Sequence, residues 1–357
     1  MINADVYYNK SDHLTRIMTG LHFLEEQKLL KCRYIEDKEH AVLPESSAIL
    51  ELRIAGKRIA FDLRDASALH QPKLIKYLAA VDMYFERSHR DWSSEEAISA
   101  YVHKIHPFGF NYFTSYPGNP ALVKSDSGSY VKRFIRDIVN NSRSSRVEAF
   151  EGKADYQVRK KPRIIFMSRL WNPADVRIRE DATPQERSYR EGMIRERQRI
   201  NADRIEICRS LKSIYGDSFC GGIQDSTYAA AQCPDLILPG YLTIKSNYLR
   251  QMKKADICIG SAGLEKSIGW KTGEYVAAAR AIVCEEFAYL LPGNFAKGQN
   301  YLPYHDVESC LAAVEALCQN PQAIYQMQLA NQQYYQAYLR PDVQILNALE
   351  KSGISVS

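Results

Sequence analysis

The feature that most constrains this chain is a strand–loop–helix–strand pattern between residues 255 and 283. The apolar run Asp256–Gly260 leads into a loop, a helix is predicted over Thr272–Ala279, and a second apolar run follows at Ile282–Cys284. The loop contains three glycines, Gly260, Gly263 and Gly269. Short apolar strands joined by helices form buried parallel sheets. We therefore expect the loop at the carboxyl edge of such a sheet, where ligands of open α/β sheets bind.

A glycine loop that leads into a helix suits an anionic ligand. Glycine lets a ligand approach the backbone closely, and the first turn of a helix presents N–H groups and the positive end of the helix dipole. Lys266 and Lys271 add positive charge. These features favour a diphosphate, and the alternative is a connection whose glycines only make turns. The spacing is not G-x-G-x-x-G, so it gives no support for a dinucleotide site.

The same alternation of strands and helices runs through the chain and predicts the α/β class. Strands are expected at Ala4–Tyr8, Ser47–Ile54, Lys57–Leu63, Asp82–Phe85, Arg163–Met167 and Phe219–Gly222. Helices are expected at Leu14–Leu30, Pro72–Ala80, Val131–Val139, Asn201–Tyr215, Ser246–Lys253, Val307–Leu317 and Pro321–Tyr338. The polar stretch 140–161 is expected to link two domains, and the charged stretch 172–199 to form a surface loop. A length of 357 residues allows two domains, at about 100–200 residues each.

Composition narrows the class of protein. The formal net charge of +5 suits an anionic ligand but is weak for a nucleic-acid binder, so we expect no nucleic-acid partner. The eight cysteines lack metal-ligand spacing and lie largely in apolar runs, which favours reduced thiols. We see neither a signal peptide nor an apolar run of about 20 residues. We therefore expect a cytoplasmic protein that can contact the membrane peripherally.

Three segments resemble bacterial glycosyltransferases of the GT-B type. Residues 269–283, GWKTGEYVAAARAIV, look like the donor-site segment of that family, which reads Lys-x-Gly-Glu-Tyr-x-Ala before an apolar strand. Residues 245–259, KSNYLRQMKKADICI, are similar to the helix and strand that precede it. Residues 163–171, RIIFMSRLW, resemble the first strand of the family's C-terminal domain. The resemblance covers about residues 160–345 and is weaker in the first half of the chain.

The resemblance implies a GT-B fold, in which two Rossmann-like parallel-sheet domains face an interdomain cleft. It implies an acceptor-binding domain at 1–155, a nucleotide-sugar-binding domain at 156–340, and a helix at 341–357 that returns towards the first domain. Glu274 matches the glutamate that binds the nucleotide ribose, and Arg169 matches the arginine that binds the diphosphate. The other donor-binding candidates are Lys245, Gly263, Ser267, Gly269 and Lys271.

One departure from the family leaves the stereochemical outcome open. Retaining members often carry two glutamates eight residues apart, whereas Lys266 stands eight residues before Glu274. The sugar-contacting residue is therefore not assigned.

The acceptor side offers three candidate catalytic residues. Asp62 and Asp65 follow a predicted strand, and either could act as the general base or orient the acceptor. The alternative for Asp62 is a structural one, in which it caps the turn and pairs with Arg64. His106 is a further candidate base, although a lone histidine is more often structural. Several tyrosines could stack on sugar rings or simply pack in the core: Tyr112, Tyr116, Tyr334, Tyr335 and Tyr338.

We therefore expect a glycosyltransferase that moves a sugar from a nucleotide-sugar donor to a saccharide or lipid-linked acceptor. By analogy, the pathway is that of a surface polysaccharide such as lipopolysaccharide. The chain lacks a D-x-D motif, so we expect no metal and no cofactor beyond the donor. The alternatives are a GT-B-like sugar-nucleotide epimerase or hydrolase, and a non-enzymatic protein that binds anionic ligands.

Overall fold

The computed structural model describes residues 1–44, 48–69, 71–123, 143–157 and 161–356. The chain divides into two compact units, each with its own sheet. Unit 1 consists of Met1–Glu151, Ala288–Phe295 and Gln333–Ser357, and unit 2 of Gly152–Phe287 and Ala296–Gln332. The expected α/β class is confirmed. The helix predicted at Val131–Val139 lies outside the described residues.

Unit 1 contains a six-stranded sheet in the order β2-β1-β3-β4-β5-β6. The strands are β1 (Ile2–Tyr8), β2 (Leu30–Glu36), β3 (Ile49–Ile54), β4 (Lys57–Asp62), β5 (Met83–Glu86) and β6 (Ile105–Pro107). Strand β3 runs antiparallel to both of its neighbours, because it forms a hairpin with β4 through Ala55 and Gly56. The other five strands share one direction. The sheet is therefore Rossmann-like with one inserted antiparallel strand.

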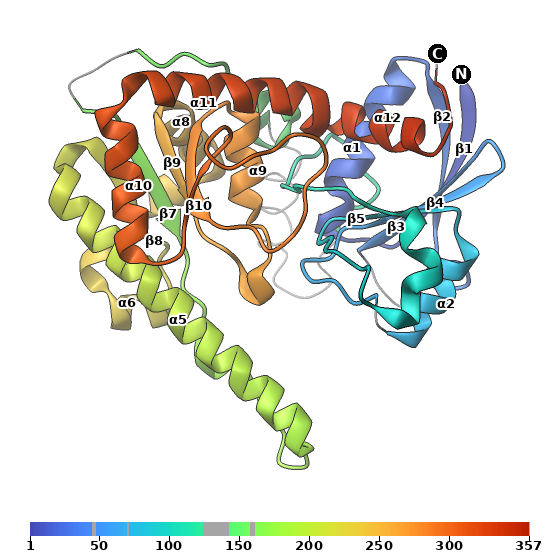
Figure 1. The fold of residues 1–357 in the computed structure, drawn as a ribbon, viewed down its shortest axis with the longest axis horizontal. Helices are drawn as coiled ribbons and strands as arrows, with labels where there is room; N and C mark the ends of the chain where they lie inside the picture. Colours follow the sequence, from blue (N-terminus) through green and yellow to red (C-terminus); the bar gives the residue numbers. More distant parts are fainter. Residues whose placement is uncertain (45–47, 70, 124–142, 158–160, 357) are drawn as a thin grey trace. The chain divides into compact units, whose positions relative to one another are not determined.

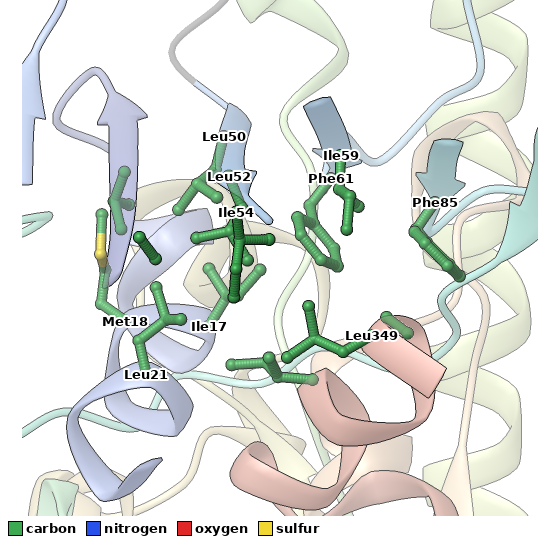
Figure 2. Close-up of a cluster of buried hydrophobic side chains, with 14 of the residues drawn as sticks. Ile17, Met18, Leu21, Leu50, Leu52, Ile54, Ile59, Phe61, Phe85 and Leu349 are labelled. Carbon is green, nitrogen blue, oxygen red and sulfur yellow. The ribbon is translucent and has the colours of Figure 1, made fainter. Parts of the chain in front are cut away.

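Helices cover both faces of the unit 1 sheet. Helices α1 (Thr15–Glu26) and α12 (Pro341–Lys351) lie on one side, and α2 (Pro72–Ala80) lies on the other (Figure 1). Figure 2 shows the core under α1 and α12, where Leu50, Leu52, Ile54, Ile59 and Phe61 point from β3 and β4 towards the two helices. These side chains are at most 2% exposed. They share one face of the sheet because successive side chains of a strand point to opposite faces.

Unit 2 contains a five-stranded, wholly parallel sheet in the order β11-β10-β9-β7-β8. The strands are β7 (Ile164–Ser168), β8 (Phe219–Ile223), β9 (Ile257–Gly260), β10 (Ala281–Glu285) and β11 (Leu302–Tyr304). The helices are α5 (Pro184–Tyr215), α6 (Thr227–Gln232), α7 (Gly240–Thr243), α8 (Lys245–Lys254), α9 (Trp270–Ala277), α10 (Val307–Gln319) and α11 (Pro321–Tyr334). Helices α5 and α10 pack on one face, and α8 and α9 lie on the other (Figure 1).

Helix α5 corrects one prediction. The stretch 172–199 was expected to be a loop, yet α5 begins at Pro184 and its first turns extend beyond the sheet of unit 2 (Figure 1). Thr183 caps the helix through a capping box with Glu186, and Pro184 occupies the first turn. Because residues 184–191 are exposed and no residue of 184–199 is buried, this stretch lacks the apolar periodicity that marks a helix in a sequence.

The first predicted helix also ends early. Helix α1 stops at Glu26, and Lys28 takes a positive φ of 59° that breaks the helix. The chain then enters β2, a strand that the sequence did not predict.

The approach of α12 to α1 depends on Gly20. A Cβ atom built on Gly20 would lie 2.3 Å from the carbonyl oxygen of Pro341. We therefore expect Gly20→Ala to lower the free energy of unfolding by about 1–3 kcal/mol through overpacking. Gly192 in α5 is the matched control, since a Cβ there meets nothing within 4 Å. Gly192→Ala should raise the free energy of unfolding by about 0.5–1 kcal/mol. Urea unfolding followed by circular dichroism measures both, and a neutral Gly20→Ala would contradict the close approach.

Candidate functional site

The carboxyl ends of β7, β9 and β10 form one edge of the unit 2 sheet. Strand β7 ends at Ser168, directly before Arg169, and β9 ends at Gly260, directly before the glycine loop. The two strands pair in parallel, so their exits are neighbours. Glu285, at the end of β10, accepts a hydrogen bond from the Ala262 amide at 2.9 Å. The predicted position of the glycine loop, at the carboxyl edge of a parallel sheet, is confirmed.

A buried arginine from α5 holds this edge together. The Arg204 guanidinium donates to the Arg169 carbonyl at 2.6 Å, to Ser261 Oγ at 3.1 Å and to the Ala262 carbonyl at 3.0 Å. Arg204 is 6% exposed, and burial is the main cause that lowers its pKa to about 10. It thus fixes the loop after β7 against the loop after β9 by hydrogen bonds to neutral acceptors.

Arg204 is not among the site residues predicted from the sequence, although the sequence contains a signal for it. Arg204 shares the buried stripe of α5 with four apolar residues, Ile200, Ile207, Cys208 and Leu211. An arginine within an apolar stripe needs several hydrogen-bond partners once it is buried. Such a position therefore indicates a structural or ligand-binding role even before the partners are known.

Lys271 lies in the first turn of α9 and faces the same edge. Its ammonium group donates to the Met167 carbonyl of β7 and lies 5.0 Å from the centre of the Tyr248 ring. Burial lowers the pKa of Lys271 to about 8, and the nearby cations Arg204, Lys245 and Arg169 lower it further. At neutral pH the group still carries its proton, so it remains a cation for an anionic ligand.

Arg169 is exposed beside this cation. Its guanidinium carbon lies 3.9 Å from the centre of the Trp171 ring, an arrangement typical of a cation–π contact. Arg169 and Lys271 therefore both lie at the carboxyl edge, together with the amino-terminal end of α9. Two cations beside a helix dipole can bind phosphate groups.

Glu274 has two partners from α8. Lys245 donates to Glu274 Oε1 at 2.6 Å, and the Tyr248 hydroxyl donates to Oε2 at 2.7 Å. Glu274 is 4% exposed, whereas the Lys245 side chain is 25% exposed. The structure thus brings two predicted donor residues, Lys245 and Glu274, into one ion pair. Tyr248 is a partner that the sequence analysis did not single out.

The glycine loop is closed on itself. The Gly263 amide donates to the Ser267 carbonyl at 2.9 Å, and a Cβ on Gly263 would meet Ser267 Oγ at 2.4 Å. Gly269 approaches the Ser261 carbonyl, which a Cβ would meet at 3.1 Å. Close contacts thus account for two of the predicted glycines.

Two residues at the tip of this loop adopt the left-handed conformation. Glu265 and Lys266 have φ values of +58° and +55°, which cost free energy for residues with a Cβ. Helix α5 compensates, because Glu196 accepts from the Glu265 amide at 2.8 Å and the Tyr189 hydroxyl donates to the Glu265 carboxylate at 2.8 Å. The exposed extension of α5 therefore supports the loop.

In unit 1, Asp62 is a buried ion-pair partner. It is 1% exposed and accepts from the Arg64 guanidinium, from the Arg64 amide at 3.1 Å and from the Tyr84 hydroxyl at 2.7 Å. This is the structural alternative that the sequence analysis left open for Asp62. Asp65 differs, because its side chain is 53% exposed and pairs with the buried Arg87.

His106 lies on the opposite face of the sheet from Asp62. In the register, Asp62 pairs with Glu86, and Phe61 pairs with Phe85, which in turn pairs with His106. Successive side chains of a strand point to opposite faces, so Asp62 and His106 are not brought together. Burial is the main cause that lowers the pKa of His106 to about 4.

Two further acidic and basic groups near Asp62 escaped the sequence analysis. Glu86, at the end of β5, is 1% exposed and accepts from Ser67 Oγ and from Trp92 Nε1 at 3.0 Å. Burial raises its pKa, and His89 Nδ1 lies 3.7 Å from its carboxylate. The run Tyr-Phe-Glu-Arg at residues 84–87 was a signal, since it places charges directly after an apolar strand.

The described residues contain no group of three or more His, Cys, Asp or Glu side chains placed to hold a metal ion. In the same part of the chain, no helix combines the length and apolar character needed to cross a bilayer.

Comparisons with known proteins find only distant likenesses. No family model and no curated protein matches the chain. A structure of MnaA from S. aureus with UDP shares 12% identity over 100% of this chain and 98% of its own, with a TM-score of 0.43. Anabaena Alr3699/HepE in complex with UDP-glucose shares 9% identity over 98% of this chain and 100% of its own, with a TM-score of 0.43.

A third structure covers part of the chain. The C-terminal domain of LpcC, a glycosyl transferase group 1 family protein from Francisella tularensis, shares 12% identity over 54% of this chain and 96% of its own, with a TM-score of 0.36. At these identities and TM-scores the likenesses carry no argument about the activity of this chain.

The Glu274 ion pair predicts a loss of stability on substitution. In Glu274→Ala, the Lys245 ammonium and the buried Tyr248 hydroxyl lose their acceptor, so we expect the free energy of unfolding to fall by about 1–3 kcal/mol. Glu286→Ala is the matched control, because Glu286 pairs with Lys297 at an exposed position, where loss of the pair should leave the free energy of unfolding almost unchanged. Equal losses in urea unfolding would contradict the buried role of Glu274.

The lowered pKa of Lys271 predicts a pH dependence of stability. Between pH 8 and about 10.4, the usual lysine pKa, the unfolded chain holds the Lys271 proton and the folded chain has released it. This group therefore makes stability rise with pH in that window. Lys271→Met should remove that rise. The free energy of unfolding of the wild type minus that of the variant should therefore increase from pH 8 to 10. A difference that stays constant with pH would contradict the lowered pKa.

Proposed function

We propose that this chain is a GT-B glycosyltransferase that binds a nucleotide-sugar donor at the carboxyl edge of the unit 2 sheet. The observation that carries the proposal is the position of Arg169, Lys271 and the amino-terminal end of α9 around the exits of β7 and β9. The resemblance of residues 245–283 to the donor segment of that family supports it. No metal is part of the proposal, because the cations can take the charge of the leaving diphosphate.

The proposed reaction moves one glycosyl group. The bond between the anomeric carbon and the phosphate oxygen breaks, a bond to the acceptor oxygen forms, and the acceptor proton passes to a base. Arg169 and Lys271 stabilise the negative charge that grows on the leaving phosphate. Of the three candidate bases, Asp65 is the most open to an acceptor, since Asp62 is buried against Arg64 and His106 is half-buried.

The ribose contact proposed for Glu274 needs one rearrangement. A carboxylate offers about four acceptor sites, and Lys245 and Tyr248 use two of them. Because Glu274 is buried and Lys245 is its more exposed partner, ribose hydroxyls would reach it when Lys245 turns away. The proposal extends to a saccharide or lipid-linked acceptor, to surface polysaccharide synthesis, and to a cytoplasmic location with peripheral membrane contact.

One observation favours a second candidate, a sugar-nucleotide epimerase or hydrolase. Such an enzyme needs several carboxylates and histidines, and unit 1 carries such a set at the ends of β4 and β5: Asp62, Asp65, Glu86 and His89. Incubation with UDP-N-acetylglucosamine and no acceptor separates the two candidates. Epimerised or hydrolysed product in the proton NMR spectrum would favour the epimerase or hydrolase. A donor that stays unchanged without acceptor, and is consumed once an acceptor is added, would favour the glycosyltransferase.

The proposal predicts a phosphate-specific loss in Arg169→Ala. A charge-assisted contact contributes about 1.5–3 kcal/mol, so the affinity for a nucleoside diphosphate should fall roughly ten- to a hundredfold. The affinity for the bare nucleoside should change far less. Calorimetry with UDP, GDP and ADP and with their nucleosides measures both.

The matched control is Lys254→Ala, since Lys254 is exposed and lies before β9, at the opposite end of that strand. It should leave the affinity unchanged. Equal losses for diphosphate and nucleoside in Arg169→Ala, or no binding of any nucleotide to the wild type, would refute the donor site.

A further inference from the structure

A cavity of about 240 Å³ lies wholly within unit 1, away from the donor residues of unit 2. Its wall combines the end of the sheet, the loop around Pro292, and α12 with the turn before it. Ring-bearing side chains dominate the lining, with the flat aromatic rings of Phe85, His106, Phe108 and Tyr338 beside the prolines Pro107 and Pro292. Among the described residues that line it, none is Leu, Ile, Val or Met. A pocket for an acyl or prenyl chain would be expected to use such flexible aliphatic side chains, so this lining favours a flat, rigid ligand.

Tyr338 lines this cavity and is also one of the tyrosines that the sequence offered as a contact for a sugar ring. Five tyrosines were considered as platforms for sugar rings, and three of them, Tyr112, Tyr334 and Tyr335, are at most 5% exposed. Tyr116 stacks on His22 with ring centres 4.0 Å apart. Tyr338 contacts Gly293 and the Tyr334 ring, whose centre lies 5.2 Å from its own, but it is partly exposed and lines the cavity, so the exposed part of its ring can contact a ligand.

The wall of the cavity is fixed before any ligand binds. The side-chain amide of Gln344 donates to the Phe108 carbonyl at 2.5 Å, and its oxygen accepts from the buried Arg16. Gly293 lies against the Tyr338 ring, which a Cβ atom would meet at 2.5 Å. A preformed pocket loses little conformational entropy on binding.

The polar groups of the lining suit hydroxyls. Asn347 lines the cavity and uses its Nδ2 to donate to the Ala337 carbonyl at 2.7 Å, and its side-chain oxygen is an acceptor that a sugar hydroxyl can use. His106 is neutral at physiological pH and can donate from one ring nitrogen and accept at the other. Lys351 adds a donor from the last turn of α12. Aromatic faces with a few donors and acceptors match a pyranose, which has apolar C–H faces and a rim of hydroxyls.

We infer that this cavity binds a single saccharide ring, in contact with the exposed part of Tyr338 and hydrogen-bonded by Asn347 and His106. Its volume lies below the roughly 300–1,000 Å³ of pockets for larger ligands, so it admits one ring and not an oligosaccharide. Naming this ring as part of the acceptor rests on the proposed function, whereas its binding does not. His106 thus becomes a ligand-binding residue and no longer a candidate base.

Saturation-transfer NMR on the full chain with methyl glycosides of glucose, galactose, mannose and N-acetylglucosamine tests the inference. At least one glycoside should receive saturation, and titration should give its dissociation constant. Tyr338→Ala should weaken binding by about tenfold through loss of the aromatic contact, whereas Tyr338→Phe should keep most of the affinity. Asn347→Leu should weaken binding while preserving side-chain volume.

Tyr325→Ala is the matched control, because Tyr325 is an exposed tyrosine of α11 in unit 2. It should leave glycoside binding unchanged, and circular dichroism should show that every variant is folded. Saturation of none of the glycosides, or binding insensitive to both Tyr338→Ala and Asn347→Leu, would overturn the inference. Tyr338-dependent binding of decyl phosphate in place of the glycosides would overturn it in favour of a lipid chain. The nucleotide test concerns Arg169 in unit 2, whereas the glycoside test concerns Tyr338 and Asn347 in unit 1. A wild type that binds no nucleotide would therefore refute the transferase proposal without changing the result for the cavity.

Discussion

The hydrogen bonds of the buried Arg204 guanidinium are the interaction on which the carboxyl edge of the unit 2 sheet, the proposed donor site, depends. The guanidinium is held by three neutral oxygen acceptors, from Arg169, Ser261 and Ala262. A charge buried in this way is costly unless its hydrogen bonds are complete. Any shift of the loop after β7 or of the loop after β9 would break one of them. The same residue therefore fixes the backbone and contributes positive potential at the edge.

The partners of the charged side chains at the carboxyl ends of the strands differ between the two units. In unit 1, Asp62 and Asp65 are each matched by an arginine, Arg64 and Arg87. In unit 2, Lys245 is matched by Glu274, whereas Arg204 and Lys271 donate to carbonyl oxygens. Repulsion among these cations and burial together lower the pKa of Lys271. A phosphate group bound at this edge would relieve that repulsion, which is the electrostatic basis of the proposed donor site.

In the glycine loop, the residues with strained backbone conformations lie at a tip that helix α5 contacts. Glu265 and Lys266 hold positive φ values at its tip, and α5 contacts this tip through Tyr189 and Glu196. The polar first turns of α5 pack little apolar surface of their own, so local hydrogen bonds and the capping box of Thr183 hold them helical. A segment that the sequence marked as a loop is thereby part of the frame of the candidate site.

The sequence by itself determined the features that depend on neighbours along the chain. The strands around Ile164–Ser168 and Ile257–Gly260 follow from apolar runs, and helices α2 and α10 follow from helical periodicity, both of which act over a few positions. The placement of the glycine loop at the carboxyl edge of a parallel sheet follows from the same pattern.

Only the tertiary structure decided which charges meet. Glu274 finds Lys245 at a sequence separation of 29, and Arg204 reaches the Arg169 carbonyl at a separation of 35. The sides of the sheet taken by Asp62 and His106 depend on strand register, which sequence alone does not fix. Whether an ionisable side chain serves a ligand or the fold is set by the partners that burial forces on it, and those partners come from distant parts of the chain.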